Sequence, residues 1–427
     1  MTIMTSKKNI VIFTSRFPYH PGEQFLEKEI EYWSGLGWAN VSLFPSDTGG
    51  EPRVVPDDIF TYTSSRTTRL RKLIFLPKAM CSAYFLREII HLYKARKLHV
   101  GNIKAALYSV INVYNYERRI RKSIGQIIDV AYTYWNSEVT YALCRLKSAG
   151  LVKSVISRAH GYDLYEYRRE GVYIPLKRQF AADMDLVCPI SDQGKKYLID
   201  TYGFSAQKVN VYRLGVSLPA AERNVEPDYT DIYDDSLSMV SVSFCLKVKN
   251  IDKIIDAIAF VAQKYSERKF KWIHIGGGRL MQNLVSYAKN KLGPLSNVSY
   301  QFLGHIDNRL IYEFYIKTPV DFIINCSSSE GIPVSLMEAM ANGVPAIAPD
   351  IGGISELIDN ESGILMSAEP DIKEIADSIN AIKNNKNRVV MENAARLMIA
   401  EKYNADMNYK EFVNMVYMMS DLNASPV

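Results

Sequence analysis

The sequence contains little cysteine and no long apolar run. Its five cysteines, Cys81, Cys144, Cys188, Cys245 and Cys326, form no C-x-x-C pair and no even framework, so neither a disulfide scaffold nor a zinc site is expected. We expect reduced thiols, most of them buried, in a cytoplasmic chain. The apolar run near the N-terminus is too short for a signal peptide, and no run reaches the roughly 18 apolar residues that span a bilayer.

The length of 427 residues favours two domains over a single core. Apolar residues make up 48% of the chain and charged residues 23%, which is typical of a soluble globular protein. Short β-branched runs alternate with helical patterns in both halves, as in α/β proteins with parallel sheets. An acidic, turn-rich stretch over residues 219–236 predicts a linker. We therefore expect one domain over residues 1–218 and a second over residues 237–400.

Positive charge is concentrated in residues 66–122, which are expected to be helical. This segment has fourteen Lys and Arg against two acids, Glu88 and Glu117, a net charge of +12, whereas the whole chain carries +5. Aromatic and aliphatic residues are interleaved with the charges at helical spacing. Two interpretations stay open: helices that pack on the first domain with a solvated basic face, or a surface that lies on an anionic membrane leaflet. No base-reading module is present, so no nucleic-acid partner is expected.

One stretch of the second half, SSSEGIPVSLMEAMANGVPAIAPDIGG from Ser327 to Gly353, carries acidic residues in unusual places. The run VDFIINC before it is short and β-branched, which predicts a buried strand. Pro333 suits the first position of the following helix, and the Asn-Gly of NGVP ends that helix. VPAIA is the next strand, so the stretch is a βαβ unit in a parallel sheet.

Two glutamates bracket the start of this helix, because Glu330 precedes it and Glu338 lies between one and two turns inside it. The first N–H groups of the helix, at Val334, Ser335 and Leu336, are expected to be free and to make an anion site. A carboxylate on either side of a phosphate site suits a ligand with paired hydroxyls at both ends, such as a sugar nucleotide. The alternative is a capping glutamate and a solvated helix glutamate.

The sequence EGIPVSLME, followed by GVPAIAPDIGGISELI, strongly resembles the E-x7-E region of retaining family-four glycosyltransferases, which have the GT-B fold. SRAHGYDLY, from Ser157 to Tyr165, resembles their H-G-x-D stretch. KVNVYRLGVSL, IHIGGGRL and YQFLGHI are similar to further strands of those enzymes. The resemblance covers roughly residues 5–400, with a weak patch between about 50 and 125.

This resemblance implies an α/β protein with two Rossmann-like, doubly wound parallel-sheet domains that face each other across a cleft. Residues 401–427 would then form a helix that crosses back to the first domain. The implied reaction is transfer of a hexose-type unit from a nucleotide-sugar donor to an acceptor hydroxyl with retention of configuration. The nucleotide sugar is a substrate, so no cofactor is expected. The members that it looks most like assemble bacterial capsule, exopolysaccharide or O-antigen repeats on lipid carriers. They imply a cytoplasmic protein bound peripherally at the inner face of the cell membrane.

The same resemblance assigns roles to individual residues. Glu330 would hold the reacting sugar, and His160 would contact the donor sugar or the charge that forms near the reaction centre. The backbone of Gly331, Ile332 and Pro333 would also contact the sugar, and Lys249, Val334 and Ser335 would bind the diphosphate. Glu338 would bind the ribose, and Gly304 would bind the base.

Two regions depart from the family pattern. Phe244 stands where an arginine is expected five residues before Lys249. Two interpretations stay open. Either Lys247 supplies the second positive charge for the diphosphate, or Lys249 and the helix N-terminus hold the diphosphate without a second cation. On the acceptor side, Gly22 is the sole candidate in the loop SRFPYHPGEQF, which lacks a Gly-Gly pattern. Asp163 is a second acceptor-side candidate, although an aspartate after glycine also makes an ordinary turn.

No metal ion is expected. Asp183 and Asp185, in the sequence DMD, mimic the metal-binding D-x-D of the other glycosyltransferase fold, but they lead from a helix directly into a strand, which favours a turn. IGGGRL lacks the full G-x-G-x-x-G pattern, so a dinucleotide site is not expected.

Two other functions stay open. A sugar-nucleotide epimerase shares this fold, but it needs added acid–base carboxylates in the cleft and no separate acceptor. A catalytically inactive GT-B binding protein would keep the fold while losing Glu330 or Lys249, and both residues are present.

Overall fold

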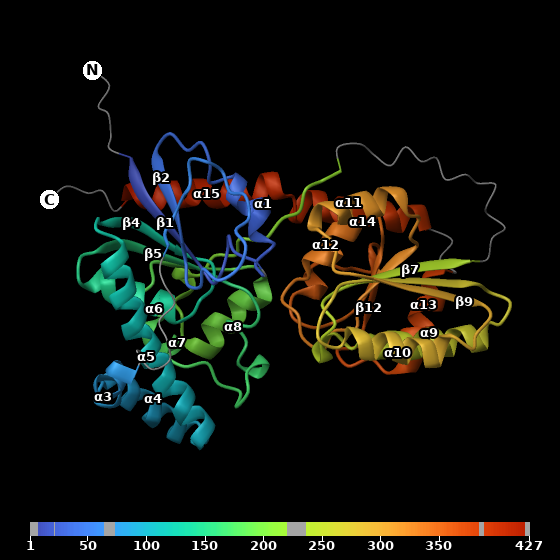
Figure 1. Cartoon of the computed structure of the whole chain (residues 1–427), viewed down its shortest axis with the longest axis horizontal. Helices are drawn as coiled ribbons and strands as arrows, with labels where there is room; N and C mark the ends of the chain where they lie inside the picture. Colours follow the sequence, from blue (N-terminus) through green and yellow to red (C-terminus); the bar gives the residue numbers. More distant parts are fainter. Residues whose placement is uncertain (1–6, 21, 64–72, 220–235, 384–387, 423–427) are drawn as a thin grey trace. The chain divides into compact units, whose positions relative to one another are not determined.

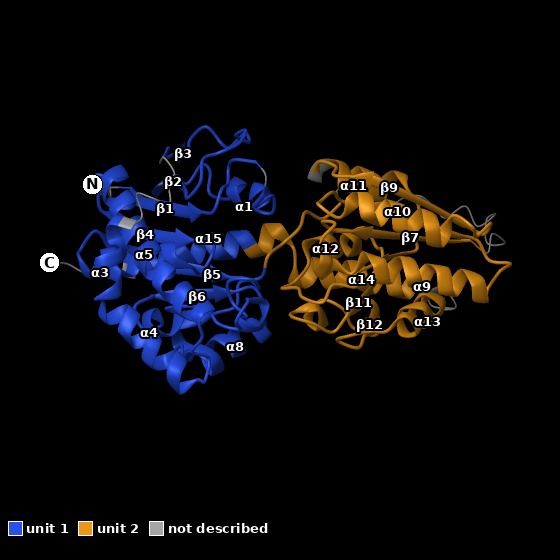
Figure 2. Ribbon diagram, turned by 60° about the horizontal axis from the view of Figure 1, so that its bottom comes forward, with its two compact units in different colours: residues 1–213, 409–427 blue, residues 214–408 orange. Residues whose placement is uncertain are grey.

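The computed structural model describes residues 7–20, 22–63, 73–219, 236–383 and 388–422. The chain forms two compact units, one of residues 1–213 and 409–427 and the other of residues 214–408 (Figure 2). Each unit contains a six-stranded sheet whose neighbouring strands run in parallel. The predicted α/β fold of two Rossmann-like domains is confirmed. Nearly all of the expected linker, residues 219–236, lies outside the described residues.

The sheet of the first unit has the strand order β3-β2-β1-β4-β5-β6, which can be followed in Figure 2; β1, β2, β4 and β5 are also labelled in Figure 1. Its strands are β1 (Lys8–Thr14), β2 (Ala39–Pro45), β3 (Phe60–Thr61), β4 (Ile128–Thr133), β5 (Val152–Ala159) and β6 (Leu186–Pro189). Its helices are α1 (Leu26–Glu31), α3 (Leu76–Met80), α4 (Ala83–Lys94), α5 (Val100–Ser123), α6 (Glu138–Ser148), α7 (Lys177–Phe180) and α8 (Asp192–Tyr202). The final helix, α15 (Ala405–Leu422), begins in the second unit and continues into the first.

Helices cover both faces of this sheet, because side chains alternate across a strand. Val11 and Phe13 of β1 pack in a core with α5, α6 and α8. Ile10 and Ile12 point the other way and pack with α1 and α15. Burial on both faces explains why the central strands are continuous apolar runs rather than alternating ones.

The second unit has the strand order β12-β11-β10-β7-β8-β9. Its strands are β7 (Leu237–Val242), β8 (Phe270–Ile275), β9 (Val298–Gly304), β10 (Phe322–Ile324), β11 (Ala346–Pro349) and β12 (Gly363–Met366). Its helices are α9 (Ile251–Lys264), α10 (Met281–Leu292), α11 (Asn308–Lys317), α12 (Val334–Ala341), α13 (Ile372–Lys383) and α14 (Arg388–Lys402). One core joins β7 and β8 to α9, α10 and α13. The short 3-10 turn η5 (Lys247–Lys249) follows β7.

The basic segment, residues 66–122, forms α3, α4 and most of α5 in its described part; residues 64–72 lie outside the described residues. The helix α5 buries Val110, Val113 and Tyr114 in the core of the first unit. The helix α4 exposes large apolar side chains instead, among them Tyr93, which is 73% exposed. Among the described residues, no helix is both long and apolar enough to cross a membrane.

A fully buried charge pair links the layers of the first unit. Arg158 of β5 is 0% exposed and Glu29 of α1 is 1% exposed, with 3.4 Å between Arg158 Nη2 and Glu29 Oε2. The hydroxyl of Tyr132 accepts from Arg158 Nε at 2.8 Å and donates to Glu29 at 2.8 Å. The guanidinium carbon also lies 4.1 Å from the ring centre of Phe412 in α15. This network ties β4, β5, α1 and α15 together.

Glu29→Ala leaves the buried guanidinium without its countercharge, so we expect a loss of about 3–5 kcal/mol in unfolding free energy. Glu31→Ala is the matched control, because Glu31 lies in the same helix but its side chain is 58% exposed; a change within about 0.5 kcal/mol is expected there. Urea unfolding measures both. Equal losses in the two variants would contradict the stabilising role of the pair.

Candidate functional site

In the second unit, two loops bring the expected donor-side residues together. The strands β7 and β10 are parallel neighbours, so the chain leaves both at the same edge of the sheet. Lys249 ends the turn after β7, and Glu330 lies in the loop between β10 and α12. The Nζ of Lys249 is 2.5 Å from Oε1 of Glu330, although the residues are 81 positions apart.

Glu330 is held as a carboxylate. It is 8% exposed, and Asn325 Nδ2 donates to its Oε1 at 3.3 Å. Burial by itself raises the pKa of Glu330, but the Lys249 ammonium and hydrogen bonds from Ser327 and Asn325 outweigh it and hold the pKa below its usual value. An ionised carboxylate only accepts hydrogen bonds, so Glu330 is suited to hold hydroxyl groups.

The start of the next helix differs from the prediction in one detail. Pro333 is the N-cap residue, with an extended ψ of 120°, and α12 begins at Val334. The N–H of Leu336 donates to the Pro333 carbonyl at 3.2 Å, so the expectation that it is free was wrong. This bond closes a tight first turn. The N–H groups of Val334 and Ser335 precede it and lie at the positive end of the helix.

A glycine loop covers the turn at Glu330. Gly352 has a φ of +56°, and a Cβ there would lie 2.1 Å from the Glu330 carbonyl oxygen. The N–H of Gly353 donates to the carbonyl of Gly331 at 2.8 Å. Ile332 is buried beside this turn. The Gly-Gly pair therefore permits the close approach that fixes the backbone around Glu330.

The other two donor-side residues lie elsewhere in the unit. Glu338 is inside α12 and 3% exposed. Burial, and then the charge of Glu338, raise the pKa of the Tyr315 hydroxyl well above its usual value, so the two side chains are near each other. Gly304 ends β9 with a φ of +72°, and its carbonyl accepts from the N–H of Gly276 at 2.8 Å.

The position of the expected arginine is occupied by an exposed phenylalanine. Phe244 is 50% exposed, so it supplies no charge and buries little surface. Lys247 is also exposed, and among the described residues its side chain makes no hydrogen bond or ion pair. Of these two lysines, Lys249 is the one that contacts Glu330.

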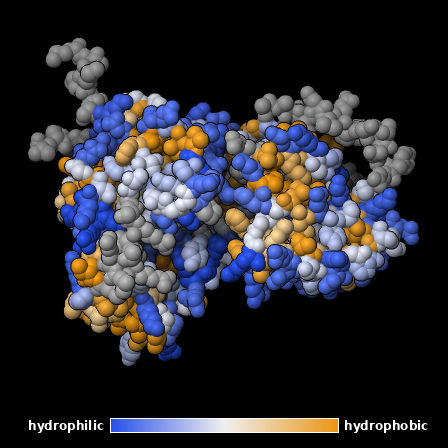
Figure 3. Space-filling view, viewed as in Figure 1, coloured by the Kyte–Doolittle hydropathy of each residue, from blue (hydrophilic) through white to orange (hydrophobic). Residues whose placement is uncertain are grey.

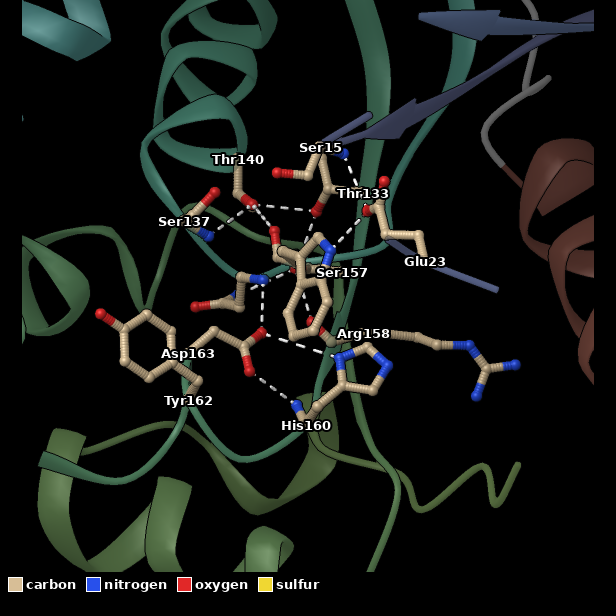
Figure 4. Close-up of polar contacts among 12 residues, drawn as sticks. Ser15, Glu23, Thr133, Ser137, Thr140, Ser157, Arg158, His160, Tyr162 and Asp163 are labelled. Carbon is tan, nitrogen blue, oxygen red and sulfur yellow. Dashed lines mark hydrogen bonds and ion pairs between the residues drawn. The ribbon is translucent and has the colours of Figure 1, made fainter. Parts of the chain in front are cut away.

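In the first unit, the loops after β1, β4 and β5 line a cavity of about 420 Å³. Gly22 and Asp163 lie in its wall, as does Trp135, which the sequence analysis did not identify. Figure 4 shows Asp163 between the strand ends, with contacts to two loops. Its Oδ1 accepts from the N–H of His160 at 2.9 Å, and its Oδ2 accepts from the N–H of Asn136 at 2.8 Å.

Asp163 therefore joins the loop after β4 to the loop after β5. It is 3% exposed. Burial by itself raises its pKa, but His160, Lys177 and the N–H of Asn136 outweigh burial and hold the pKa below its usual value. An ionised carboxylate that takes two backbone donors positions both loops rather than making an ordinary turn.

His160 is packed among aromatic rings. Its ring centre lies 4.6 Å from those of Tyr134 and Trp135. The residue is 8% exposed, and among the described residues neither ring nitrogen has a hydrogen-bond partner. Its Nδ1 is 3.9 Å from Asp163 Oδ2, which is beyond hydrogen-bond reach. An imidazole in this state is available to a ligand.

Glu23 is a further residue that the sequence analysis missed. It has a φ of +53° and follows Gly22, whose φ is +108°. Its two carboxylate oxygens accept from the N–H groups of three loop residues and from an indole: Ser15 (2.9 Å), Arg16 (2.5 Å), Phe17 (2.6 Å) and Trp135 Nε1 (2.6 Å). Figure 4 shows Glu23 beside Ser15 at the end of β1. An acidic residue directly after the loop glycine was the available signal.

The Asp183–Asp185 segment makes structural contacts. Asp185 accepts from Lys147 Nζ at 2.5 Å and from the N–H of Val155 at 2.8 Å, which joins the turn to α6 and β5. In the part of the chain that the structure describes, no group of three or more His, Cys, Asp or Glu is arranged to hold a metal ion.

Comparison with known proteins adds the following. Residues 223–398 match the family model described as glycosyl transferases group 1. The chain is 26% identical over 430 residues to the amylovoran biosynthesis glycosyltransferase AmsK of Erwinia amylovora, covering 95% of this chain and 98% of that one.

Two solved structures share the fold. One is the apo lipopolysaccharide outer core galactosyltransferase WaaB, with a TM-score of 0.65, 17% identity, and coverage of 96% of this chain and 99% of that one. The other is Anabaena Alr3699/HepE in complex with UDP and glucose, with a TM-score of 0.59, 15% identity and the same coverage.

Proposed function

Because this chain is a GT-B glycosyltransferase of the family-four type, we propose that it is a retaining enzyme that moves a sugar from a nucleotide-sugar donor to the hydroxyl of a lipid-linked acceptor. The product would be a repeat unit of a bacterial capsule, exopolysaccharide or O-antigen. The observation that carries this proposal is the Lys249–Glu330 pair at the start of α12. A sugar diphosphate needs a cation, a carboxylate and backbone donors. The pair supplies the first two, and the N–H groups of Val334 and Ser335, which form no hydrogen bond in the part of the chain that the structure describes, follow Glu330 directly in the sequence.

In the proposed reaction, the bond between the anomeric carbon and the diphosphate oxygen breaks, and the diphosphate leaves with the electron pair. Lys249 and the N–H groups of Val334 and Ser335 stabilise the charge that develops on it. Glu330 accepts from hydroxyls of the sugar as an oxocarbenium-like centre forms. These contacts strengthen in the transition state, so they lower the barrier rather than only binding the donor.

Retention follows from attack on the same face that the diphosphate leaves. Glu330 already accepts from Lys249 and Asn325, which suits a hydroxyl acceptor better than a nucleophile. The acceptor oxygen then bonds to the anomeric carbon, and its proton passes to the leaving phosphate. His160, whose ring nitrogens have no hydrogen-bond partner among the described residues, would contact the donor sugar, and Gly22 and Asp163 would border the acceptor.

The two alternatives are less well supported. An epimerase needs acid–base carboxylates, whereas Glu23 and Asp163 are both occupied by backbone donors. An inactive binding protein has no need for the Lys249–Glu330 contact. UDP and glucose in the HepE neighbour support a nucleotide-sugar donor.

The first test is a thermal-shift panel of UDP-, GDP- and ADP-sugars. A donor at about 100 times its Kd stabilises the protein by ~2.7 kcal/mol. Lys249→Met should abolish the shift because the diphosphate loses its cation, whereas the control Lys247→Met should keep most of it.

Turnover of the donor found in this way should survive EDTA. Turnover that EDTA abolishes and manganese restores would contradict the metal-independent mechanism.

Glu330 and Glu338 should fail in different ways. Glu330→Ala should lower kcat by roughly 10- to 100-fold, because a charged hydrogen bond contributes about 1.5–3 kcal/mol and this one tightens in the transition state. Glu338→Ala should chiefly raise the donor KM, because ribose contacts are equal in both states. Steady-state kinetics measures kcat and the donor KM of both variants. Glu369→Ala is the control, because Glu369 is exposed. Equal, small effects of both changes would leave only the capping explanation.

A membrane partner is proposed for the outer face of α3 and α4. Figure 3 shows apolar surface broken by charge over these helices, at the lower left. The exposed apolar residues of this α3–α4 surface are Ile74, Met80, Leu86, Ile90, Tyr93 and Leu98. Exposed basic residues lie among and beside them: Arg87, Lys94, Arg96 and Lys104. Apolar side chains flanked by cations suit an anionic leaflet, where each nearby Lys or Arg contributes ~1 kcal/mol.

Not every basic residue of the segment serves this surface. Arg119 is buried and donates to the carbonyl of Ser46 at 2.9 Å. Lys97 pairs with Glu166 at 2.8 Å. These two residues hold the first unit together, so they are excluded from a test of the surface.

Flotation with liposomes tests the membrane proposal. Binding should rise with anionic lipid, fall with salt, and weaken when Arg87, Lys94, Arg96 and Lys104 are all changed to Gln. In the control, four exposed lysines of the second unit are changed to Gln, which removes the same amount of charge: Lys269, Lys271, Lys289 and Lys373. A folded protein that ignores anionic liposomes at low salt would point to a soluble acceptor.

A further inference from the structure

Lys177 is a buried lysine that the proposed reaction does not use. It is the first residue of α7 and is 0% exposed. Among the described residues it forms no ion pair; its Nζ donates to the backbone carbonyl of Asn136 at 3.0 Å and to Asn136 Oδ1. Burial of an ammonium group without a carboxylate in direct contact is costly, and the charge of Asp163 offsets only part of that cost.

The backbone that delivers Lys177 is also strained. Leu176, the residue before it, is 1% exposed and has a φ of +66°, in the left-handed region that non-glycine residues avoid. The ring centre of Tyr202 lies 5.6 Å from Lys177 Nζ. A strained residue therefore directly precedes the buried amine, and both hydrogen bonds of that amine go to Asn136.

Asn136 is the centre of the loop between β4 and α6. Its N–H donates to Asp163 Oδ2 at 2.8 Å, and its Nδ2 donates to the hydroxyl of Ser157 at 3.0 Å. The preceding residue, Trp135, lines the cavity of the first unit and packs on the His160 ring. A shift of Asn136 would therefore move Trp135 in the cavity wall.

We infer that Lys177 is a positioning residue: its amine fixes the β4–α6 loop at Asn136 and so holds Trp135 in the cavity wall and against His160. The link to catalysis rests on the proposed function, because the cavity would border the acceptor. The structural part stands without it, since it concerns the order of one loop.

The titration of Lys177 supplies a signature that ordinary packing would not. The charged and titratable groups that face it are Asp163, Glu138, Arg169 and Tyr202. Burial lowers the pKa of Lys177 from 10.5 to about 7, with Asp163 opposing and Arg169 assisting the shift. An opening of the loop that hydrates Lys177 would return it towards 10.5. Between these pH values the open form binds a proton that the closed form does not, so opening becomes less favourable as pH rises.

Hydrogen exchange of the whole protein tests the inference without any substrate. In Lys177→Met, protection of the Asn136 and His160 amides should fall roughly tenfold, as expected for the loss of a hydrogen bond to a buried group. Amides of the second unit should not change. Lys253→Met is the control, because Lys253 donates to the Pro370 carbonyl at 3.0 Å in the second unit. Unchanged protection at Asn136 and His160 would overturn the inference, as would a loss spread over the whole first unit.

The pH dependence tests it on the wild-type protein alone, so the result does not depend on the variant folding. After correction for intrinsic exchange, protection of the two amides should rise between pH 7 and pH 8.5. In Lys177→Met it should be flat. A flat wild-type profile would overturn the inference.

A kinetic arm separates this inference from the proposed function. With the donor found in the thermal-shift panel, turnover by the wild-type protein should rise between pH 7 and pH 8.5. Lys177→Met should keep the donor-induced thermal shift, but its turnover should be lower and should not rise over this pH range. Normal turnover in a variant with a loosened loop would overturn the catalytic part. Absence of a shift with every nucleotide sugar, in wild type and variant alike, would instead refute the proposed function and leave the exchange result intact.

Discussion

Parallel pairing of neighbouring strands is the constraint on which both candidate sites depend. In a parallel sheet every strand ends at the same edge, so loops far apart in the sequence emerge side by side. This places Lys249 within 2.5 Å of Glu330 across 81 positions. It also places the indole of Trp135 within 2.6 Å of Glu23 across 112 positions. Neither contact is local, and both follow from which strands are neighbours in the sheet.

Buried charge is distributed unevenly over these contacts. Glu330, Asp163 and Glu23 each accept hydrogen bonds from several donors, and for Glu330 and Asp163 such contacts hold the pKa below its usual value. Their partners are mainly backbone N–H groups and a lysine, which fix loop conformation. His160 and Lys177 are different: among the described residues, the ring nitrogens of His160 have no hydrogen-bond partner, and the amine of Lys177 donates to Asn136 rather than to a carboxylate. Groups left in such states are candidates for ligand contact or for control of a loop.

The structure divides the basic segment into a packed part and an exposed part. The helix α5 packs into the core of the first unit, and its Arg119 holds the end of β2. The helix α4 exposes Leu86, Ile90 and Tyr93 beside basic residues. One part of the segment is therefore structural, while the other part has surface properties that suit an anionic leaflet. Net charge alone did not separate these parts, because it does not say which side chains the fold buries.

The sequence by itself determined the α/β class, the two sheets, and the strand–loop–helix unit that contains Glu330 and Glu338. These features are set locally by β-branched runs, glycine turns and the helix start at Pro333–Val334, which was misplaced by one residue. The tertiary structure decided which loops meet, and so it revealed Glu23, Trp135, Asn136 and Lys177. Glu23 pairs with Trp135 and Lys177 pairs with Asn136 across tens of positions. Of these four residues only Glu23, directly after the loop glycine, had a local signal, because strand order fixes which distant loops meet. It also decided the ionisation of Glu330, because burial and the approach of Lys249 exist only in the folded chain.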